Sequence, residues 1–383
     1  MKQPIVVVKI GTSSLVDERG RLDKKRLAHH VASIGEIKRK NFHVVLVSSG
    51  GIAAGFYELG LTERPRTLAG KQAAAAVGQG ALIQNYRERF AEQGVICAQV
   101  LLTRSDFDNR SRYRNALQTL EYLLDRGVVP IINENDSVAV DEICWGDNDT
   151  LAALVAGLLQ AEELLLVTNT NGVYTDNPQK NPKATLIHHL ESVGEELLAS
   201  LDDSKSTLGS GGMRSKLLAA RIASEAGVRV HIGSEQLEID WMIQTLMQQG
   251  SGTTIEAAPR HISRKEHWIS RHSAPAGQLQ VDEGAAQALL KEGSSLLPIG
   301  VVAVNGEFQE GDIVRVVDST GVEIGRGMSR YAANWIVQVL GRRSEDVVIH
   351  RNDWVATPSV ATYLHRKPQM DLSTSVDGEE SGQ

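Results

Sequence analysis

Short runs of β-branched and aliphatic residues alternate with longer amphipathic stretches over roughly the first 250 residues, and this alternation limits the fold more than any other feature. Each run is too short for a helix and is mostly apolar on both faces, as buried parallel strands are. Between the runs, Leu27, Val31 and Ile34 recur at helical spacing. The pattern predicts an α/β fold in which helices cover a mainly parallel sheet. The predicted strands are residues 5–9, 44–48, 95–102, 128–133, 164–168 and 228–232.

The character of the sequence changes after residue 256. Residues 257–276 are rich in Arg, Lys and His and end in Ser-Ala-Pro-Ala, followed by Gly277, which indicates an interdomain connection. Residues 277–356 contain short β-rich runs separated by Gly-containing turns, as a small β domain does. Residues 357–383 are polar, acidic and aperiodic, which predicts disorder. We therefore expect two domains, 1–256 and 277–356, a linker at 257–276 and a loose tail.

Composition excludes several classes of protein. The net charge is −7 and aromatic residues make up 4%, so neither a basic field nor a stacking platform for nucleic acid is expected. Two cysteines, Cys97 and Cys144, cannot form a disulfide framework, and the eleven His are scattered, so no protein-held metal is expected. The first apolar run, residues 4–8, is too short for a signal peptide, and no run has the roughly 18 apolar residues that span a bilayer. A cytoplasmic location is expected.

Polar or Gly-rich sequence follows the predicted strands, where ligands of parallel sheets usually bind. Lys9 is followed by Gly11 and three hydroxyl residues, which suits a phosphate, although a strand exit with a tight turn would look the same. Residues 48–51, Ser-Ser-Gly-Gly, begin a predicted helix whose free amides favour a carboxylate or phosphate; an ordinary strand-to-helix turn is the alternative.

Three later segments add charge and small polar groups. Residues 133–136 and 147–149 carry carboxylates and amides that suit an ammonium group or a lysine network, or are solvated loops. Residues 168–175 suit a nucleotide base or ribose, or form an Asn-Gly turn. In residues 209–216, glycine amides and Lys216 could meet the same phosphates as Lys9, and this segment is the most specific signal.

Several common catalytic motifs are absent from the sequence. Ser215 precedes Lys216, so no G-x-x-x-x-G-K-[ST] run occurs, and no G-x-G-x-x-G follows a strand. H-E-x-x-H, C-x-x-C and G-x-S-x-G are also missing. The Walker phosphate loop and the dinucleotide fingerprint therefore do not apply.

Taken in order, these motifs resemble the amino acid kinase family, and the C-terminal part resembles a PUA domain. The resemblance rests on residues 9–13, 48–50, 132–136, 146–149 and 209–216, and on 281–285 and 293–298 for the second domain. It implies a three-layer α/β/α sandwich with a mainly parallel sheet, followed by a small β-rich PUA domain. The implied reaction is ATP-dependent phosphorylation of the side-chain carboxylate of L-glutamate, the first step of proline biosynthesis.

The resemblance also assigns roles to residues at matching positions. It implies Lys9, Lys216 and Asp149 as catalytic residues, with Mg²⁺ carried by the nucleotide. Asn169 stands where relatives usually have Asp, which removes a charge near the nucleotide. The residues implied to bind glutamate are Ser49, Gly50, Asn133, Asp136, Asp147 and Asn148. Those implied to bind ATP are Lys9, Gly11, Thr168, Asn169, Ser210, Gly211, Gly212, Met213, Arg214, Ser215 and Lys216.

Two alternatives to this function remain open. One is a kinase for another acidic metabolite, such as acetylglutamate or aspartate, and the other is an RNA-binding module on an inactive kinase scaffold. Residues 275–356 hold seven Lys or Arg against eleven Asp or Glu, whereas an RNA-binding face usually has a basic footprint, so RNA binding is not expected. The resemblance further implies a homo-oligomer, dimer or tetramer, and feedback inhibition by proline through the loops at 133–146.

Overall fold

The structure is a computed structural model, and it describes residues 3–138, 148–178, 180–200, 212–234, 240–259, 269 and 275–357. The chain divides into two compact units, Met1–His267 and Trp268–Gln383. Most of the predicted linker and residues 358–383 of the predicted tail lie outside the described residues. The boundaries expected at 256 and 277 and the disorder of the tail therefore stay predictions.

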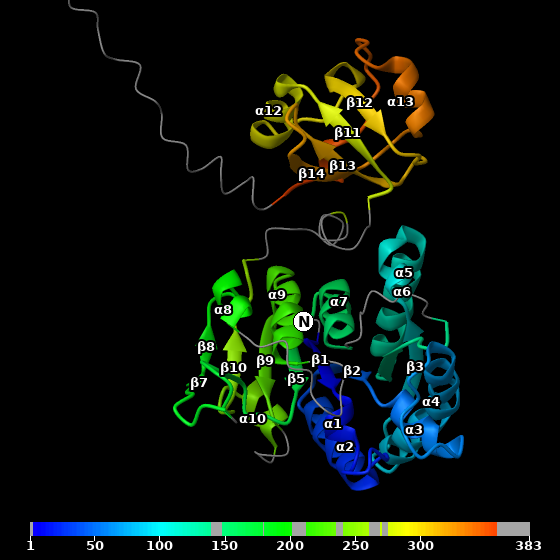
Figure 1. Cartoon of the computed structure of the whole chain (residues 1–383), viewed down its shortest axis with the longest axis vertical. Coiled ribbons are helices and arrows are strands. Elements are labelled where there is room, and N and C mark those ends of the chain that lie inside the picture. The colour runs from blue at the N-terminus through cyan, green and yellow to red at the C-terminus, as the bar shows by residue number, and fades with distance from the viewer. Residues whose placement is uncertain are drawn as a thin grey trace, which may run out of the picture. The chain divides into compact units, whose positions relative to one another are not determined.

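The first unit contains an eight-stranded sheet in the order β3-β4-β2-β1-β5-β9-β10-β8 (Figure 1). The strands from β3 to β9 in that order run parallel, whereas β10 is antiparallel to β9 and parallel to β8. The strands are β1 (Ile5–Ile10), β2 (His43–Ser48), β3 (Cys97–Leu102), β4 (Val129–Glu134), β5 (Glu163–Val167), β8 (His189–Leu190), β9 (Arg229–Gly233) and β10 (Thr253–Ile255). The mainly parallel α/β sheet predicted from the sequence is confirmed.

The six predicted strands are all present, with ends that differ from the prediction by at most two residues. The central strand β1 is buried along its whole length, which explains its nearly continuous apolar sequence. The sequence did not predict β8, β10 or the small hairpin of β6 (Val173–Tyr174) and β7 (Leu186–Ile187). These strands have two or three residues each, which is too few for a recognisable period.

Helices cover both faces of the sheet, so the three-layer architecture is also confirmed (Figure 1). On one face α2 (Lys24–Arg39) packs against α4 (Leu68–Ala91) and α10 (Trp241–Leu246). On the other, α7 (Asn148–Leu159) packs against α6 (Arg110–Asp125) and α9 (Met213–Glu225). The shorter helices are α1 (Thr12–Leu15), α3 (Gly51–Glu58), α5 (Arg104–Asp108) and α8 (Glu195–Ser200).

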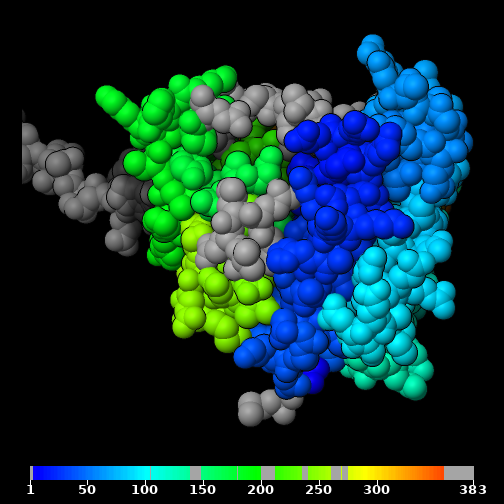
Figure 2. Space-filling view, turned by 90° about the horizontal axis from the view of Figure 1, so that it is seen from below, coloured from blue at the N-terminus to red at the C-terminus, as the bar shows by residue number. Residues whose placement is uncertain are grey.

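Helix α2 illustrates how the sequence dictates local structure. The Asp23 side chain accepts hydrogen bonds from the Lys25 and Arg26 amides and so caps the start of the helix. The predicted stripe, with Leu27, Val31 and Ile34, is buried against the sheet. Figure 2 shows the blue N-terminal residues on this side of the unit, between the light blue and cyan residues of its first half and the green residues of its second.

Two glycines let α3 and α4 cross in direct contact. A Cβ atom on Gly55 would lie 1.9 Å from the Ala74 carbonyl oxygen, and one on Gly78 would lie 1.9 Å from the Gly51 carbonyl oxygen. No side chain fits at such distances, so glycine is required at both positions. The close crossing fixes the start of α3 and the connection to α4, and both border the site described below.

The second unit has its own core and a five-stranded sheet in the order β12-β11-β13-β14-β15. Its β-rich character, predicted from the sequence, is confirmed. The strands are β11 (Gly277–Val281), β12 (Val301–Asn305), β13 (Ile313–Val317), β14 (Glu323–Met328) and β15 (Trp354–Ala356). Its helices are α12 (Glu283–Lys291) and α13 (Ala333–Val339), with 3₁₀ turns at Pro298–Gly300 and Arg351–Asp353.

Candidate active site

The topology of the first unit brings the predicted motifs to one edge of the sheet. Strand β1 lies between β2 and β5, and all three run parallel, so the residues that follow them emerge on the same side. The chain moves from β1 to β2 on one side and later to β5 on the other, which makes this edge the place where ligands of such sheets bind.

Lys9, Asp149 and Lys216 form a buried ion-pair cluster at this edge. The Lys9 Nζ atom lies 2.5 Å from Asp149 Oδ1, and the Lys216 Nζ atom donates a hydrogen bond of 2.8 Å to Asp149 Oδ2. The side chains of Lys9, Asp149 and Lys216 are 3%, 0% and 11% exposed. One carboxylate therefore positions two ammonium groups, one through each oxygen, and the three formal charges add to +1.

Three separate elements supply this cluster. We call Lys9 and Lys216 the lysine pair, and Asp149 is the carboxylate that bridges them. Lys9 lies in β1, Asp149 in the first turn of α7 and Lys216 in the first turn of α9. Helices α7 and α9 pack together, which brings two residues 67 positions apart into contact. Burying these charges costs free energy, which close pairing at best offsets, so the cluster adds little to the stability of the fold. Its presence therefore points to a functional role. Two fixed ammonium groups suit a phosphoryl group.

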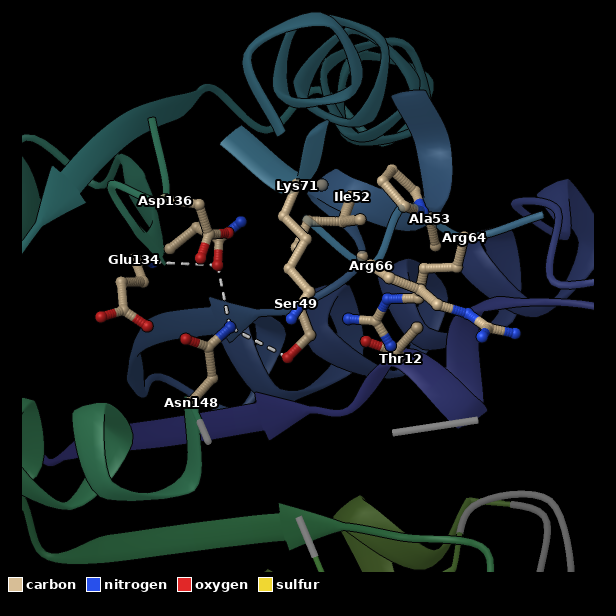
Figure 3. Close-up of a pocket in the computed structure, with 14 residues that line it drawn as sticks. Thr12, Ser49, Ile52, Ala53, Arg64, Arg66, Lys71, Glu134, Asp136 and Asn148 are labelled. Atoms are coloured by element: carbon tan, nitrogen blue, oxygen red, sulfur yellow. Dashed lines mark hydrogen bonds between the residues drawn. The ribbon is translucent and has the colours of Figure 1, made fainter. Parts of the chain in front are cut away.

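A hydrogen-bond network around Asn148 connects four elements beside this cluster (Figure 3). The Asn148 Nδ2 atom lies 2.8 Å from Asn133 Oδ1, 2.9 Å from Ser49 Oγ and 3.1 Å from the Ser48 carbonyl oxygen. Asn133 in turn donates to Gln79 Oε1 at 2.7 Å. The network connects the ends of β2 and β4 with the start of α7 and the middle of α4. Gln79 was missed by the sequence analysis because it lies inside a helix, away from any strand end.

A cavity of about 510 Å³ lies in front of this network. Five of the residues predicted to bind substrate line it, namely Ser49, Gly50, Asn133, Asp136 and Asn148. The sixth, Asp147, lies outside the described residues. The other lining residues are Thr12, Gly51, Ile52, Ala53, Arg64, Pro65, Arg66, Lys71 and Glu134. The structure therefore brings most of the predicted substrate residues together, with Glu134 from the predicted acidic segment 133–136, and adds three cations that the sequence analysis missed.

Gly50 shapes the floor of the cavity. Its φ of +107° lies in the left-handed region that favours glycine, and it precedes α3, whose start has no side-chain cap. The residues that open α3, from Gly51 to Ala53, line the cavity. The N-terminal end of a helix carries partial positive charge, which adds to this wall.

Two carboxylates occupy another wall of the cavity. Burial, together with the neighbouring negative charge of Asp136, raises the pKa of Glu134 to about 7. Burial also raises the pKa of Asp136, while the positive charge of Arg64 opposes that rise. An ammonium group from a ligand would stabilise the ionised form of both carboxylates, so this wall suits such a group.

The residues predicted to contact nucleotide are only partly described. Thr168 follows β5 and is buried, with its amide bonded to the Gly233 carbonyl at 2.8 Å. Gly212 precedes α9, and Ser215 Oγ donates to the Gly212 carbonyl at 2.8 Å. Met213 and Arg214 lie in the first turn of α9, and Asn169 follows Thr168. The predicted residues Ser210 and Gly211 lie outside the described residues.

Lys9 folds back beneath the turn that follows its strand. A Cβ atom built on Gly11 would lie 3.4 Å from Lys9 Nζ, so the glycine leaves room for the ammonium group. Two side chains of α2 hold this turn from behind. The Arg26 guanidinium donates to the Val16 carbonyl at 2.7 Å, and His30 Nε2 donates to the Ser14 carbonyl at 3.2 Å.

His30 supports the site and is another residue that the sequence analysis missed. It is buried, and burial lowers its pKa to about 4, so it is neutral at pH 7. In the tautomer that donates to Ser14, its Nδ1 atom carries no proton. The two adjacent His residues gave no metal spacing, and nothing in the sequence pattern distinguished a bracing histidine from a core one.

No group of three His, Cys, Asp or Glu side chains among the described residues is arranged to hold a metal ion. No helix in the described part of the chain combines the length and the apolar content that a membrane crossing requires.

The chain is similar to known protein families in both of its units. Residues 4–234 match the amino acid kinase family, and residues 277–351 match the PUA domain. The chain is 48% identical over 366 residues to a glutamate 5-kinase of Geobacillus thermodenitrificans, which covers 93% of this chain and 98% of that protein. It is 45% identical over 364 residues to glutamate 5-kinase 1 of Bacillus licheniformis, which covers 93% of this chain and 99% of that protein.

Among solved structures, carbamate kinase from Giardia lamblia bound to AMP-PNP is similar in fold. It aligns with a TM-score of 0.50 and 17% sequence identity, over 67% of this chain and 99% of that chain.

Proposed function

The chain belongs to the amino acid kinase family, and from that premise we propose that it transfers the γ-phosphoryl group of ATP to the side-chain carboxylate of L-glutamate. The products are L-glutamyl 5-phosphate and ADP, and the reaction is the first step of proline biosynthesis. The observation that carries the chemistry is the buried Lys9–Asp149–Lys216 cluster beside the cavity. The near full-length similarity to glutamate 5-kinases supports glutamate as the acceptor.

The reaction needs no general base. A glutamate side chain is ionised at pH 7, so one of its carboxylate oxygens attacks the γ-phosphorus directly. A new oxygen–phosphorus bond forms while the bond from the γ-phosphorus to the β–γ bridging oxygen breaks, and the electron pair leaves with ADP. Catalysis then depends on positioning the two anions in line and on offsetting their charge.

The two lysines supply that positive charge. Lys9 and Lys216 stabilise charge on the transferred phosphoryl group and on the departing ADP oxygen. Asp149 accepts both ammonium groups and so fixes their separation and direction. Because these side chains are buried, their field is screened by water less than that of surface lysines.

Glutamate occupies the cavity with its side chain directed toward the lysine pair. Asn148 and Thr12 line the cavity and adjoin Asp149 and Gly11 in the sequence, so the cavity reaches this part of the sheet edge. The carboxylates of Glu134 and Asp136 accept the α-ammonium group. Ser49, Gly50 and the Asn133–Asn148 network supply donors and fix the walls, and Asp147 is a further predicted contact.

ATP binds with its phosphates over Lys9, Gly11 and the start of α9. Gly212, Met213, Arg214 and Ser215 in that start, together with Ser210 and Gly211, form the predicted phosphate segment, while Thr168 and Asn169 contact the nucleoside. Mg²⁺ carried by the ATP phosphates would supply further positive charge there, as it commonly does in phosphoryl transfer. The amide of Asn169 leaves the nucleotide side less negative than an aspartate would.

We further propose that the chain forms a homo-oligomer and that proline inhibits it at the glutamate cavity. The PUA domain modulates assembly or regulation. Its seven Lys or Arg against eleven Asp or Glu in residues 275–356 disfavour nucleic acid. Salt-sensitive binding of a structured RNA at submicromolar concentration would contradict this assignment.

Acceptor specificity tests the proposed function. The purified chain is incubated with ATP, Mg²⁺ and hydroxylamine, and acyl-hydroxamate formation is compared for L-glutamate, L-aspartate and N-acetyl-L-glutamate. We expect turnover with L-glutamate above the other two. A preference for N-acetyl-L-glutamate or L-aspartate would identify that compound as the substrate instead of L-glutamate. No turnover with any acceptor would favour an inactive kinase scaffold.

A further inference from the structure

Three basic side chains line one side of the cavity and have no role in the proposed mechanism. Arg64 and Arg66 lie in the connection between α3 and α4, and Lys71 lies in the first turn of α4. We call them the cation cluster. In Figure 3 Lys71 extends from α4 toward the side of the cavity where Ser49 lies, while Arg64 and Arg66 lie on the side of Thr12.

The charges that line the cavity are separated by sign. Glu134 and Asp136 come from the end of β4, whereas the cation cluster comes from the α3–α4 segment. The positive charge of Arg64 opposes the rise of the Asp136 pKa, so the charges of the two walls interact. A cavity with both signs on separate walls fits a dipolar ligand such as a free α-amino acid.

Charge matching assigns the two walls to the two ends of that amino acid. L-Glutamate has two carboxylates and one ammonium group. The proposed reaction requires the side-chain carboxylate at the lysine pair, and Glu134 and Asp136 suit the α-ammonium group. The α-carboxylate then needs a positive partner, and among the described residues that line the cavity the cation cluster supplies the only cationic side chains.

We propose that Arg64, Arg66 and Lys71 bind the α-carboxylate of L-glutamate and make the enzyme select acceptors with a free α-carboxylate. This inference rests on the proposed function. The three side chains are solvent-exposed, and that of Arg66 is 92% exposed, so each alone contributes little and the cluster acts jointly. The geometry of guanidinium groups suits a planar carboxylate.

The test compares two triple variants with the same change in charge. The first is Arg64→Gln/Arg66→Gln/Lys71→Gln. The matched control is Lys24→Gln/Arg39→Gln/Arg89→Gln, which alters cations that face solvent or lie partly exposed on α2 and α4, away from the cavity lining. A thermal melt verifies that both variants fold.

The acceptors are L-glutamate and L-isoglutamine, whose α-carboxylate is replaced by an amide while the side-chain carboxylate and α-amine remain. Binding of each without ATP is measured by titration calorimetry, and kcat/KM by hydroxamate formation. We expect the wild type to prefer L-glutamate, and the first variant to lose at least about 10-fold in affinity and kcat/KM for L-glutamate. Values for L-isoglutamine and the KM for ATP stay unchanged, and the control variant keeps the wild-type preference.

Other outcomes overturn the inference. They are equal losses for both acceptors, a loss of the preference in the control variant, a rise confined to the KM for ATP, and a wild type that does not distinguish the two acceptors. Calorimetry separates this failure from failure of the proposed function. A chain that binds L-glutamate with the expected preference but does not phosphorylate it contradicts the function and supports the cation cluster.

Discussion

Replacing Asp149 with Asn is the most informative single perturbation of the lysine pair. The substitution keeps the shape of the side chain but removes the charge that lies 2.5 Å from Lys9 and 2.8 Å from Lys216. The Asn oxygen can still accept one ammonium group, while its NH₂ group faces the other. Because Asp149 is fully buried, the loss leaves uncompensated positive charge away from water.

The magnitude follows from the cost of breaking a buried ion pair, about 3–5 kcal/mol. For a unit of this size, each kcal/mol lowers Tm by roughly 2–4 °C, so the expected fall in Tm is roughly 6–20 °C. ATP supplies phosphate charge at the lysines, so it raises the Tm of the variant more than that of the wild type. The turnover falls as well, because the two ammonium groups are no longer fixed.

Differential scanning calorimetry at low salt, with and without ATP, measures these shifts. The control is Asp125→Asn, which removes an exposed carboxylate at the end of α6. A Tm within about 2 °C of the wild type, together with unchanged kcat, would refute the reasoning, since it would mean that Asp149 neither compensates nor positions the lysines.

Three further outcomes are expected. Lys216→Ala lowers kcat far more than it weakens glutamate binding; a change confined to KM would assign Lys216 to uniform binding. Because the pKa of Glu134 is about 7, the KM for glutamate falls as pH rises through 7. The Glu134→Gln variant loses that pH dependence. An unchanged pH profile in the variant would exclude Glu134 as a partner of the α-ammonium group. His30 is held neutral with a pKa of about 4, below its ordinary 6.5, so the unfolded chain takes up a proton first as pH falls. The free energy of unfolding of the wild type therefore drops by about 2 kcal/mol between pH 7.5 and 5, and that of the His30→Gln variant drops by less. Chemical unfolding at the two pH values measures both losses, and equal losses in the two proteins would contradict this.

Much of the fold follows directly from the sequence. Parallel strands buried on both faces need continuous apolar runs, so β1, β2 and β4 are visible without a structure. The strands of two or three residues, such as β8 and β10, leave no periodic signal. Strand β10 pairs with β9, and β8 pairs with β10, through tertiary contacts that no local pattern encodes.

The site divides along the same line. Some site residues lie near strand ends or at a helix start, where a search of the carboxyl edge of the sheet finds them. Lys9 and Asn133 lie near the ends of β1 and β4, and Asp149 lies at the start of α7. Gln79 and the cation cluster do not follow any strand. Gln79 joins the Asn133 network and the cation cluster lines the cavity because α3 and α4 cross closely at Gly55 and Gly78. That crossing is a property of packing rather than of sequence period.

Oxygen transfer tests the central claim most directly, that a carboxylate oxygen of the substrate attacks ATP at the lysine pair. L-Glutamate labelled with ¹⁸O in its side-chain carboxylate is incubated with the chain, ATP, Mg²⁺ and hydroxylamine. Hydroxylamine attacks the acyl carbon, so the released phosphate keeps the oxygen that bridged carbon and phosphorus. The account predicts phosphate with one ¹⁸O atom, seen as an isotope shift in the ³¹P spectrum and formed together with hydroxamate. Phosphate released without ¹⁸O would contradict it.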